Sequence, residues 1–232
     1  MKILALETSE MAGSLAAFVD GQLLLEMPLN SLRRSAQSLA PGIRELMDRV
    51  GWRTVDLGLV AVGIGPGSFT GVRVGVASAK VLAYAAGSEV LGVETLETIA
   101  TGCPAGVERV SVVVDAQRGD VVVQQFRRQP DGAFVADEPW QLRSIEAWLA
   151  GLPAGICVTG PVLRKLADRL PSHVTALAPT CWSPRAETVG RLAFQQYTAG
   201  HRGDVWKLLP IYFRRSAAEE TWDAKEASRS GA

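Results

Sequence analysis

Two halves of the chain show the same order of predicted elements, and this order restricts the fold more than any other feature of the sequence. Each half reads strand, strand, strand, helix, strand, helix, strand, helix. In the first half the strands span 2–6, 14–19, 22–27, 57–64 and 90–93, and the helices span 39–50, 69–86 and 95–100. In the second half the strands span 109–114, 121–127, 134–135, 156–159 and 173–177, and the helices span 145–150, 162–170 and 183–197. The order predicts two related α/β units.

Turn and cap residues mark several of these boundaries. Asp20-Gly21 and Asp131-Gly132 each separate two apolar runs, which is typical of two-residue hairpin turns. We predict Ser183 as the N-cap of the last helix, with Pro184 at its first helical position. Pro41 either kinks the first helix or lies in its first turn, and the sequence leaves both alternatives open.

An acidic residue ends the first strand of each half, Glu7 in one and Asp115 in the other. Two βββαβα units with this feature predict an α/β protein with the two-lobed actin/Hsp70/sugar-kinase (ASKHA) fold, whose units are ribonuclease H-like. In that fold the two acidic strand ends face each other across a cleft that holds nucleotide phosphates and a metal. We predict an N-terminal lobe at residues 1–104 and a C-terminal lobe at 105–232 that ends in a polar tail.

Composition narrows the class of protein. Hydrophobic residues make up 47% of the 232, which is enough for a substantial core. The 24 Lys and Arg balance the 24 Asp and Glu, so we do not expect this chain to grip nucleic acid directly. Cys103, Cys157 and Cys181 form no C-x-x-C pair and fit a reducing compartment. No run is apolar enough for a signal segment or a membrane span, so we expect a cytoplasmic protein without membrane contact.

A glycine-rich segment, residues 63–75, joins a buried strand to a helix. A junction of this kind presents backbone N–H groups at a helix N-terminus, where an anion can bind. The segment lacks the Gly-Lys-Ser/Thr end of a Walker A loop and the spacing of G-x-G-x-x-G. The alternative is a tight turn in which Ser68 or Thr70 caps the helix, and residue chemistry alone favours this alternative.

The helix over 69–86 carries a small residue at every fourth position: Gly71, Gly75, Ala79 and Ala83. A glycine inside a helix costs roughly 0.5–1 kcal/mol relative to alanine, so the close approach of another backbone must offset this cost. That backbone belongs either to the protein's own sheet or to a second chain. We predict that the helix packs on the sheet and also forms a subunit interface, so that Gly75→Leu breaks association more than folding. The preceding helix would share this interface through Leu39, Ile43, Leu46 and Met47.

Few other residues point to chemistry, and no catalytic residue stands out. The candidate contacts for a nucleotide or its phosphates are Glu7, Thr8, Ser9 and Asp115, although carboxylates at strand ends are also common in ordinary loops. His173 and His201 have no metal-ligand spacing, so we predict no metal site. A Ser-His-Asp triad can assemble from distant residues, but no G-x-S-x-G marks a nucleophile.

Four stretches of the sequence resemble the TsaB (YeaZ) family, which belongs to the ASKHA superfamily. Three of them are residues 3–9, 115–121 and 210–214. The fourth is highly specific and consists of Gly65, Pro66, Gly67, Ser68, Phe69, Thr70, Gly71, Val72, Arg73, Val74 and Gly75. The four occur in the same order as in the family, and the resemblance extends over nearly the whole chain. The sequence departs from the family pattern at Glu7, where aspartate is common, and at Ser35-Ala36, where His-Ser is common.

The resemblance implies a non-catalytic subunit of the bacterial machinery that makes threonylcarbamoyladenosine in tRNA. Its partners would be TsaD, the metal-bearing subunit that transfers a threonylcarbamoyl group to the adenosine next to the anticodon, and the ATPase TsaE. Family members pair through the first two helices of the N-terminal lobe, so the resemblance implies a homodimer in isolation and tRNA contact only through the complex. It implies no cofactor on this chain alone and ATP or ADP only within the complex.

Two other functions stay open at this point. One is an ATP-dependent small-molecule kinase of the same fold, which requires Glu7 and Asp115 to bind a magnesium nucleotide. The other is a glycoprotease-like metallopeptidase, which requires a metal cluster that the sequence does not show.

Overall fold

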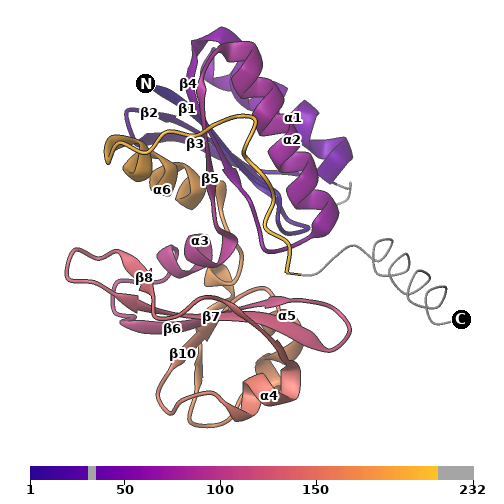
Figure 1. Ribbon diagram of the computed structural model, residues 1–232, viewed down its shortest axis with the longest axis vertical. Coiled ribbons are helices and arrows are strands. Elements are labelled where there is room, and N and C mark those ends of the chain that lie inside the picture. The colour runs from indigo at the N-terminus through magenta and orange to yellow at the C-terminus, as the bar shows by residue number, and fades with distance from the viewer. Residues whose placement is uncertain (31–34, 214–232) are drawn as a thin grey trace, which may run out of the picture.

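The computed structural model describes residues 1–30 and 35–213. It has two lobes, each built on one β-sheet (Figure 1). The N-terminal sheet has the order β3-β2-β1-β4-β5, from β1 (Lys2–Glu7), β2 (Ser14–Val19), β3 (Gln22–Pro28), β4 (Leu57–Gly63) and β5 (Glu89–Val93). The C-terminal sheet has the order β11-β10-β6-β7-β8, with β9 paired to β7. Its strands are β6 (Arg109–Asp115), β7 (Asp120–Arg128), β8 (Phe134–Ala136), β9 (Gln141–Ser144), β10 (Cys157–Thr159) and β11 (Thr175–Ala176).

The helices connect and cover these sheets. They are α1 (Ser35–Val50), α2 (Phe69–Ala86), α3 (Thr95–Thr101), α4 (Ile145–Ala150), α5 (Leu163–Leu166) and α6 (Ala186–Thr198). Short 3-10 turns span Thr54–Asp56, Ala167–Arg169 and Pro179–Cys181. Within residues 1–30 and 35–213, none of the helices combines the length and the apolar character that crossing a membrane requires.

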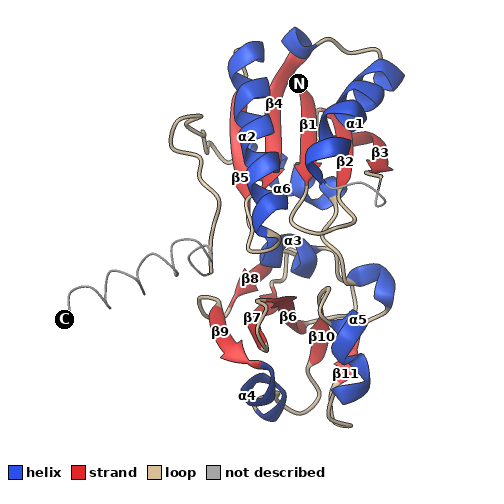
Figure 2. Cartoon of the chain, turned by 90° about the vertical axis from the view of Figure 1, so that its right-hand side faces the viewer, coloured by secondary structure: helices blue, strands red, loops and turns tan. Residues whose placement is uncertain are grey.

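Strand β1 lies in the middle of the N-terminal sheet and is buried on both faces. It pairs antiparallel with β2 and parallel with β4, so that Ala5 lies between Ala16 and Ala61. Because successive side chains of a strand point to opposite faces, Leu4 and Leu6 join the core under α1 and α2, whereas Ala5 joins the core under α6. Figure 2 shows α1 and α2 on one side of this sheet and α6 on the other.

Helices α3 and α6 each pack against the sheet of the other half of the chain (Figure 1). Leu96 and Ile99 of α3 share a core with strands β6 and β7. Val189 and Ala193 of α6 share a core with β1, β2, β4 and β5. The boundary between residues 104 and 105 stays a prediction. Helix α3, from before this boundary, packs on the C-terminal sheet, and α6, from after it, packs on the N-terminal sheet.

The α/β class and the two-lobed fold are as expected from the duplicated order of elements. The hairpin turn at Asp20 and Gly21 has φ angles of 48° and 79°, as a two-residue turn of this type requires. Helix α1 begins at Ser35 rather than near Leu39, so Pro41 lies in its second turn and the first-turn alternative is wrong.

Three predictions for the C-terminal half need correction. Helix α6 begins at Ala186 with Arg185 as its N-cap, so Ser183 is not the cap, because side chains from the N-terminal lobe cap this helix instead. The segment 162–170 forms a short α-helix and a 3-10 turn rather than one helix. The strand predicted at 173–177 is reduced to β11, and β9 is an additional strand. The polar tail lies outside the described residues.

Candidate functional site

The glycine-rich motif forms a turn between β4 and α2 that rests on the end of β1. Ser68 caps α2, because its Oγ accepts a hydrogen bond from the backbone N–H of Gly71 at 3.3 Å. The backbone N–H of Ser68 donates to the carbonyl of Ser9 at 2.7 Å. The peptide bond between Gly65 and Pro66 is cis. The motif therefore fixes helix α2 to the loop after β1, and the cap is Ser68 rather than Thr70.

The two glycines inside α2 stand where the helix approaches Thr8. A Cβ atom on Gly71 would lie 2.0 Å from the carbonyl oxygen of Thr8, and one on Gly75 would lie 2.2 Å from Thr8 Oγ1. Thr8 Oγ1 also donates a hydrogen bond to the carbonyl of Gly71 at 2.8 Å. The close backbone that the sequence requires is therefore the protein's own strand end, which needs glycine at both positions.

All eight residues predicted for an interface on the helix pair are buried within this chain. They lie in the core between the two helices and the sheet: Leu39, Ile43, Leu46, Met47, Gly71, Gly75, Ala79 and Ala83. A partner would therefore meet mainly other side chains, on the outer faces of α1 and α2. The use of these helices as an interface stays a prediction.

The outer faces of α1 and α2 and the 3-10 turn after α1 form a groove of about 680 Å³. Val81 lies on its edge with 67% of its surface exposed, and Tyr84 of the same helix is 71% exposed. Exposed apolar side chains that gather around a groove are typical of a surface that binds another molecule. The lining residues are Ala40, Ile43, Arg44, Met47, Asp48, Trp52, Arg53, Thr54, Ala77, Ser78, Val81 and Leu82.

Glu7 is fully buried, together with Thr8 and Ser9. Burial raises the pKa of Glu7 to about 7, and hydrogen bonds from Ser9 oppose this shift. Its Oε1 accepts from the backbone N–H of Ser9 at 2.5 Å, while Oε2 has no partner among the described residues. A Cβ atom on Gly63 would lie 2.3 Å from this Oε2. The carboxyl group is thus packed under its own loop rather than exposed to a cleft.

Asp115, the second predicted acidic residue, is paired with a cation. Its Oδ2 accepts from Lys165 Nζ at 2.8 Å, and its Oδ1 accepts from the backbone N–H of Gln117 at 2.7 Å. Desolvation acts against the charged form, but these two donors outweigh it and lower the pKa of Asp115. Arg164, the residue before Lys165, forms an ion pair with Glu10 of the N-terminal lobe, with its Nη1 2.8 Å from Glu10 Oε2. Lys165 of α5 therefore pairs with the carboxylate of Asp115 that was predicted to contact a nucleotide.

Arg73 of the motif has a structural role that the sequence analysis missed. Its Nε donates to the hydroxyl of Tyr212 at 2.8 Å, and its guanidinium lies 3.7 Å from the centre of the Phe69 ring. The same segment is held by the backbone N–H of Ile211, which donates to the carbonyl of Ile64 at 2.8 Å. Arg73 and Tyr212 both lie in stretches that resemble the family, residues 65–75 and 210–214, and this was the one sequence feature that could have indicated their contact.

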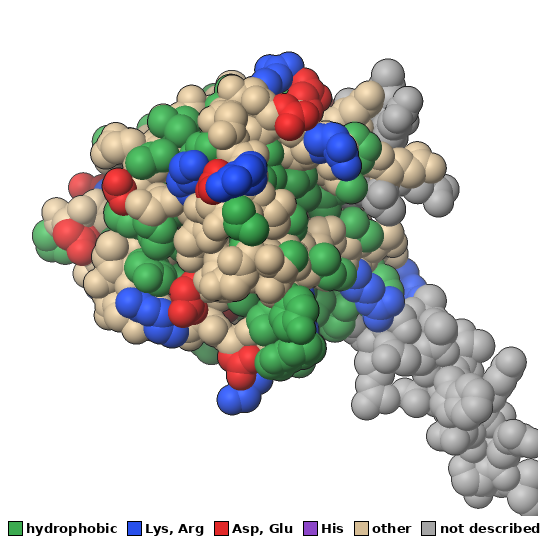
Figure 3. Space-filling model, turned by 90° about the horizontal axis from the view of Figure 1, so that it is seen from above, with side chains coloured by type: hydrophobic (Ala, Val, Ile, Leu, Met, Phe, Trp, Pro, Cys, Tyr) green, Lys and Arg blue, Asp and Glu red, His purple; other side chains and the backbone are tan. Residues whose placement is uncertain are grey.

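Histidines and cysteines of the described residues show no metal-binding arrangement. His173 Nε2 lies 3.1 Å from the carbonyl of Leu152, and His201 Nδ1 lies 3.1 Å from the carbonyl of Gln196. Among residues 1–30 and 35–213, no three His, Cys, Asp or Glu side chains come together as metal ligands. The face shown in Figure 3 carries Lys and Arg beside Asp and Glu, so no charge of one sign gathers there.

Known proteins match this chain over its length. The family described as "TsaD: tRNA N6-adenosine threonylcarbamoyltransferase" matches residues 27–137. The "tRNA threonylcarbamoyladenosine biosynthesis protein TsaB" of Escherichia coli (strain K12) is 35% identical over 97% of this chain and 100% of its own. The chain belongs to the TsaB family. Another TsaB, from Bacillus subtilis (strain 168), is 27% identical over 96% of this chain and 98% of its own.

Solved structures agree with membership of the TsaB family. "YeaZ from Pseudomonas aeruginosa" superimposes with a TM-score of 0.78 at 29% identity, over 91% of this chain and 99% of that one. The resemblance inferred from the motif at 65–75 is therefore confirmed, and with it the two-lobed ASKHA fold. The TsaB motif in this chain holds α2 against β1 and carries Arg73, which binds the segment near residue 212.

Proposed function

We propose that the protein is a non-catalytic subunit of the machinery that makes threonylcarbamoyladenosine in tRNA, and that it acts by binding a TsaD-type catalytic partner. The observation that carries the proposal is the 35% identity to the Escherichia coli TsaB over the full length of that protein. The match of residues 27–137 to the TsaD family supports it further. This region contains α1 and α2, so the similarity between this chain and the TsaD family includes the two helices proposed to pair.

The proposed docking surface is the groove between α1 and α2. Its apolar edge at Val81 and its flanking charges, Arg44 and Asp48, suit a second helix pair of similar construction. In the absence of TsaD the same surface would pair two copies of this chain, which gives a homodimer. The ATPase TsaE would join the assembled complex.

The chemistry is assigned to the partner because neither of the two acidic strand ends is free to bind a ligand. Glu7 is buried, and Asp115 is held by Lys165. We therefore propose that this chain has no activity alone, and that ATP or ADP binds only within the complex. The balance of 24 basic and 24 acidic residues supports indirect contact with tRNA through the partner.

The test is reconstitution with TsaD and TsaE from the same organism. Val81→Arg places a charge on the edge of the groove and should abolish both co-elution with TsaD and threonylcarbamoyl transfer to tRNA. Val135→Arg is the matched control, since Val135 lies on β8 of the other lobe, is 48% exposed and should leave both unchanged. Threonylcarbamoyl transfer by the isolated chain, or an intact complex with Val81→Arg, would contradict the proposal.

The ATP-dependent kinase alternative is distinguished by calorimetry of the isolated chain. A kinase of this fold binds Mg–ATP without a partner, whereas the proposed subunit shows no heat of binding. Binding that is lost in Asp115→Asn would favour the kinase.

A further inference from the structure

A groove in the C-terminal lobe lies far along the chain from the proposed docking helices. Its volume is about 530 Å³, a size typical of small-molecule sites. The floor of the groove is one face of strands β6 and β7. Helix α4 covers one end of this face and leaves the other end open. Val113 and Val123 are paired in register and buried there, whereas the next pairs on this face, Ser111 with Gln125 and Arg109 with Arg127, line the groove. The uncovered end of the face is therefore polar.

Two polar side chains on the lining of the groove are buried. Ser111 is fully buried and Trp148 of α4 is 2% exposed. Neither Ser111 Oγ nor Trp148 Nε1 makes a hydrogen bond with any residue that the structure describes. Buried donors of this kind are nearly always satisfied in folded proteins, so a polar ligand that enters the groove can supply the missing acceptors.

Three arginines line the groove against two carboxylates, Asp137 and Glu138, so its charges favour an anion. Arg109 and Arg127 lie directly opposite each other on neighbouring strands, and a pair of like charges in this position is unfavourable unless it is neutralised. Both share one carboxylate, Asp137, at 3.1 Å and 3.4 Å. Arg143 of β9 adds a third guanidinium to the lining, where it donates hydrogen bonds to the neutral side chain of Gln141.

We propose that this groove binds a small organic anion, whose carboxylate or phosphate group accepts from the N–H groups of Arg109 and Arg127 that Asp137 does not bind, and whose body lies toward Trp148. Guanidinium groups bind both kinds of anion through paired N–H donors, and each of the two arginines keeps further N–H groups beyond the bond to Asp137. Val123, Pro139 and Leu152 on the lining suit an apolar or planar body. The proposal does not depend on the proposed function, because none of these residues belongs to α1 or α2.

The experiment uses the full chain and three probes with the same ring: benzoate, phenyl phosphate and neutral benzamide. The indole N–H resonance of Trp148, assigned through Trp148→Phe, reports binding by NMR titration. We expect a saturable shift with at least one of the two anions and none with benzamide. The stronger of benzoate and phenyl phosphate identifies the preferred anionic group.

Two variants make the result specific. Arg127→Gln removes one of the opposed guanidinium groups and should weaken anion binding by about tenfold or more. Arg169→Gln is the matched control, because Arg169 is also an ion-paired arginine of this lobe, bound to Glu146, but does not line the groove. Ser111→Ala removes a hydroxyl that has no hydrogen-bond partner among the described residues, so the variant should fold normally and weaken binding as well.

Several outcomes would overturn the proposal. Absence of a saturable shift with both anions at millimolar concentration would do so. Equal weakening by Arg169→Gln would reveal only general attraction of anions to a basic residue. Displacement of the probes by any single-stranded RNA through the same arginines would assign the groove to nucleic acid rather than to a small molecule.

Discussion

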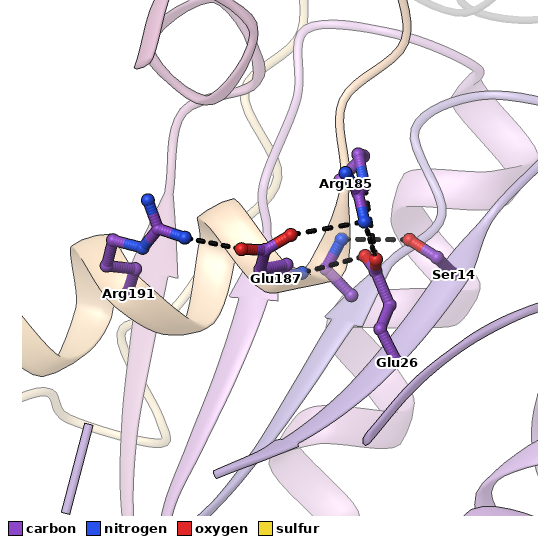
Figure 4. Close-up of polar contacts among 6 residues, drawn as sticks. Ser14, Glu26, Arg185, Glu187 and Arg191 are labelled. Carbon is purple, nitrogen blue, oxygen red and sulfur yellow. Dashed lines mark hydrogen bonds and ion pairs between the residues drawn. The ribbon is translucent and has the colours of Figure 1, made fainter. Parts of the chain in front are cut away.

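Glu26 on β3 binds Arg185 at the start of α6, although 159 positions separate the two residues (Figure 4). The other carboxylate oxygen of Glu26 accepts from the backbone N–H of Glu187 at 3.0 Å. Ser14 Oγ on β2 accepts from the backbone N–H of Ala186 at 2.8 Å. The N-terminal lobe thus supplies two side chains that cap the N-terminus of α6, a helix from the C-terminal half. The negative charge of Glu26 is favourable at this end of the helix.

We predict that Glu26→Ala lowers the free energy of unfolding by about 1–2 kcal/mol, because it removes a cap and leaves the N–H of Glu187 without its acceptor. Chemical denaturation measures the change. Glu45→Ala is the control, since Glu45 forms a surface pair with Arg49 within α1 and should cost less than about 0.5 kcal/mol. Equal effects of the two substitutions would show that Glu26 acts as an ordinary surface charge.

The cap of α6 shows why sequence patterns located elements better than their exact ends. The end of α2 at Ala86 was correctly predicted, because the signal is local: Gly87 follows the helix in a left-handed conformation. Ser183 was wrongly predicted as a cap, because the true capping groups, Ser14 and Glu26, come from the other lobe. Sequence patterns likewise predict that α3 and α6 each have an apolar face, but not which of the two sheets that face covers.

The helix-pair residues show a second limit of sequence patterns. Burial against the protein's own sheet and burial against a partner produce the same run of apolar and small residues. Leu46 and Gly75 are therefore buried within this chain, although the pattern also suited an interface. The outer surface at Val81 and the paired state of Asp115 follow only from three-dimensional contacts.

Glu7 predicts a pH dependence of stability. Its pKa is about 7 in the folded protein against an ordinary value of 4.5, so the folded state holds the proton more tightly than the unfolded state. This contribution to stability is fully present below about pH 4.5 and is lost as the pH rises to about 7. Glu7→Gln should therefore stabilise the protein at pH 8, by roughly 3 kcal/mol or less, and change little at pH 4.5.

Denaturation of Glu7→Gln and of the parent protein across this range measures the effect as a difference between the two curves. Glu45→Gln, an exposed carboxyl on α1, should run parallel to the parent. A constant difference at all pH values would contradict a raised pKa for Glu7, because the effect must vanish where the carboxyl is protonated in both states.

Gly75→Leu should unfold the protein rather than merely separate subunits, which reverses the expectation from sequence alone. The new Cβ atom would lie 2.2 Å from Thr8 Oγ1, so strand end and helix would have to move apart. We expect a loss of about 3 kcal/mol or more, or no soluble protein. Ala85→Leu adds the same side chain at an exposed position of the same helix and should be neutral within about 0.5 kcal/mol. A stable but monomeric Gly75→Leu protein would restore the interface interpretation.

Arg73 should control the attachment of residues 210–213 to α2. Arg73→Met removes the hydrogen bond to Tyr212 and the contact of the charge with the Phe69 ring, while it keeps an unbranched side chain of similar length. We expect the amide of Ile211, which donates to the carbonyl of Ile64, to exchange its hydrogen about tenfold faster, with little change in global stability. Hydrogen exchange followed by NMR measures this. Lys207→Met is the control, because Lys207 lies in the same segment, is largely exposed and pairs only with nearby Asp204 among the residues described. Unchanged protection of Ile211 in Arg73→Met would show that backbone contacts alone hold the segment against α2.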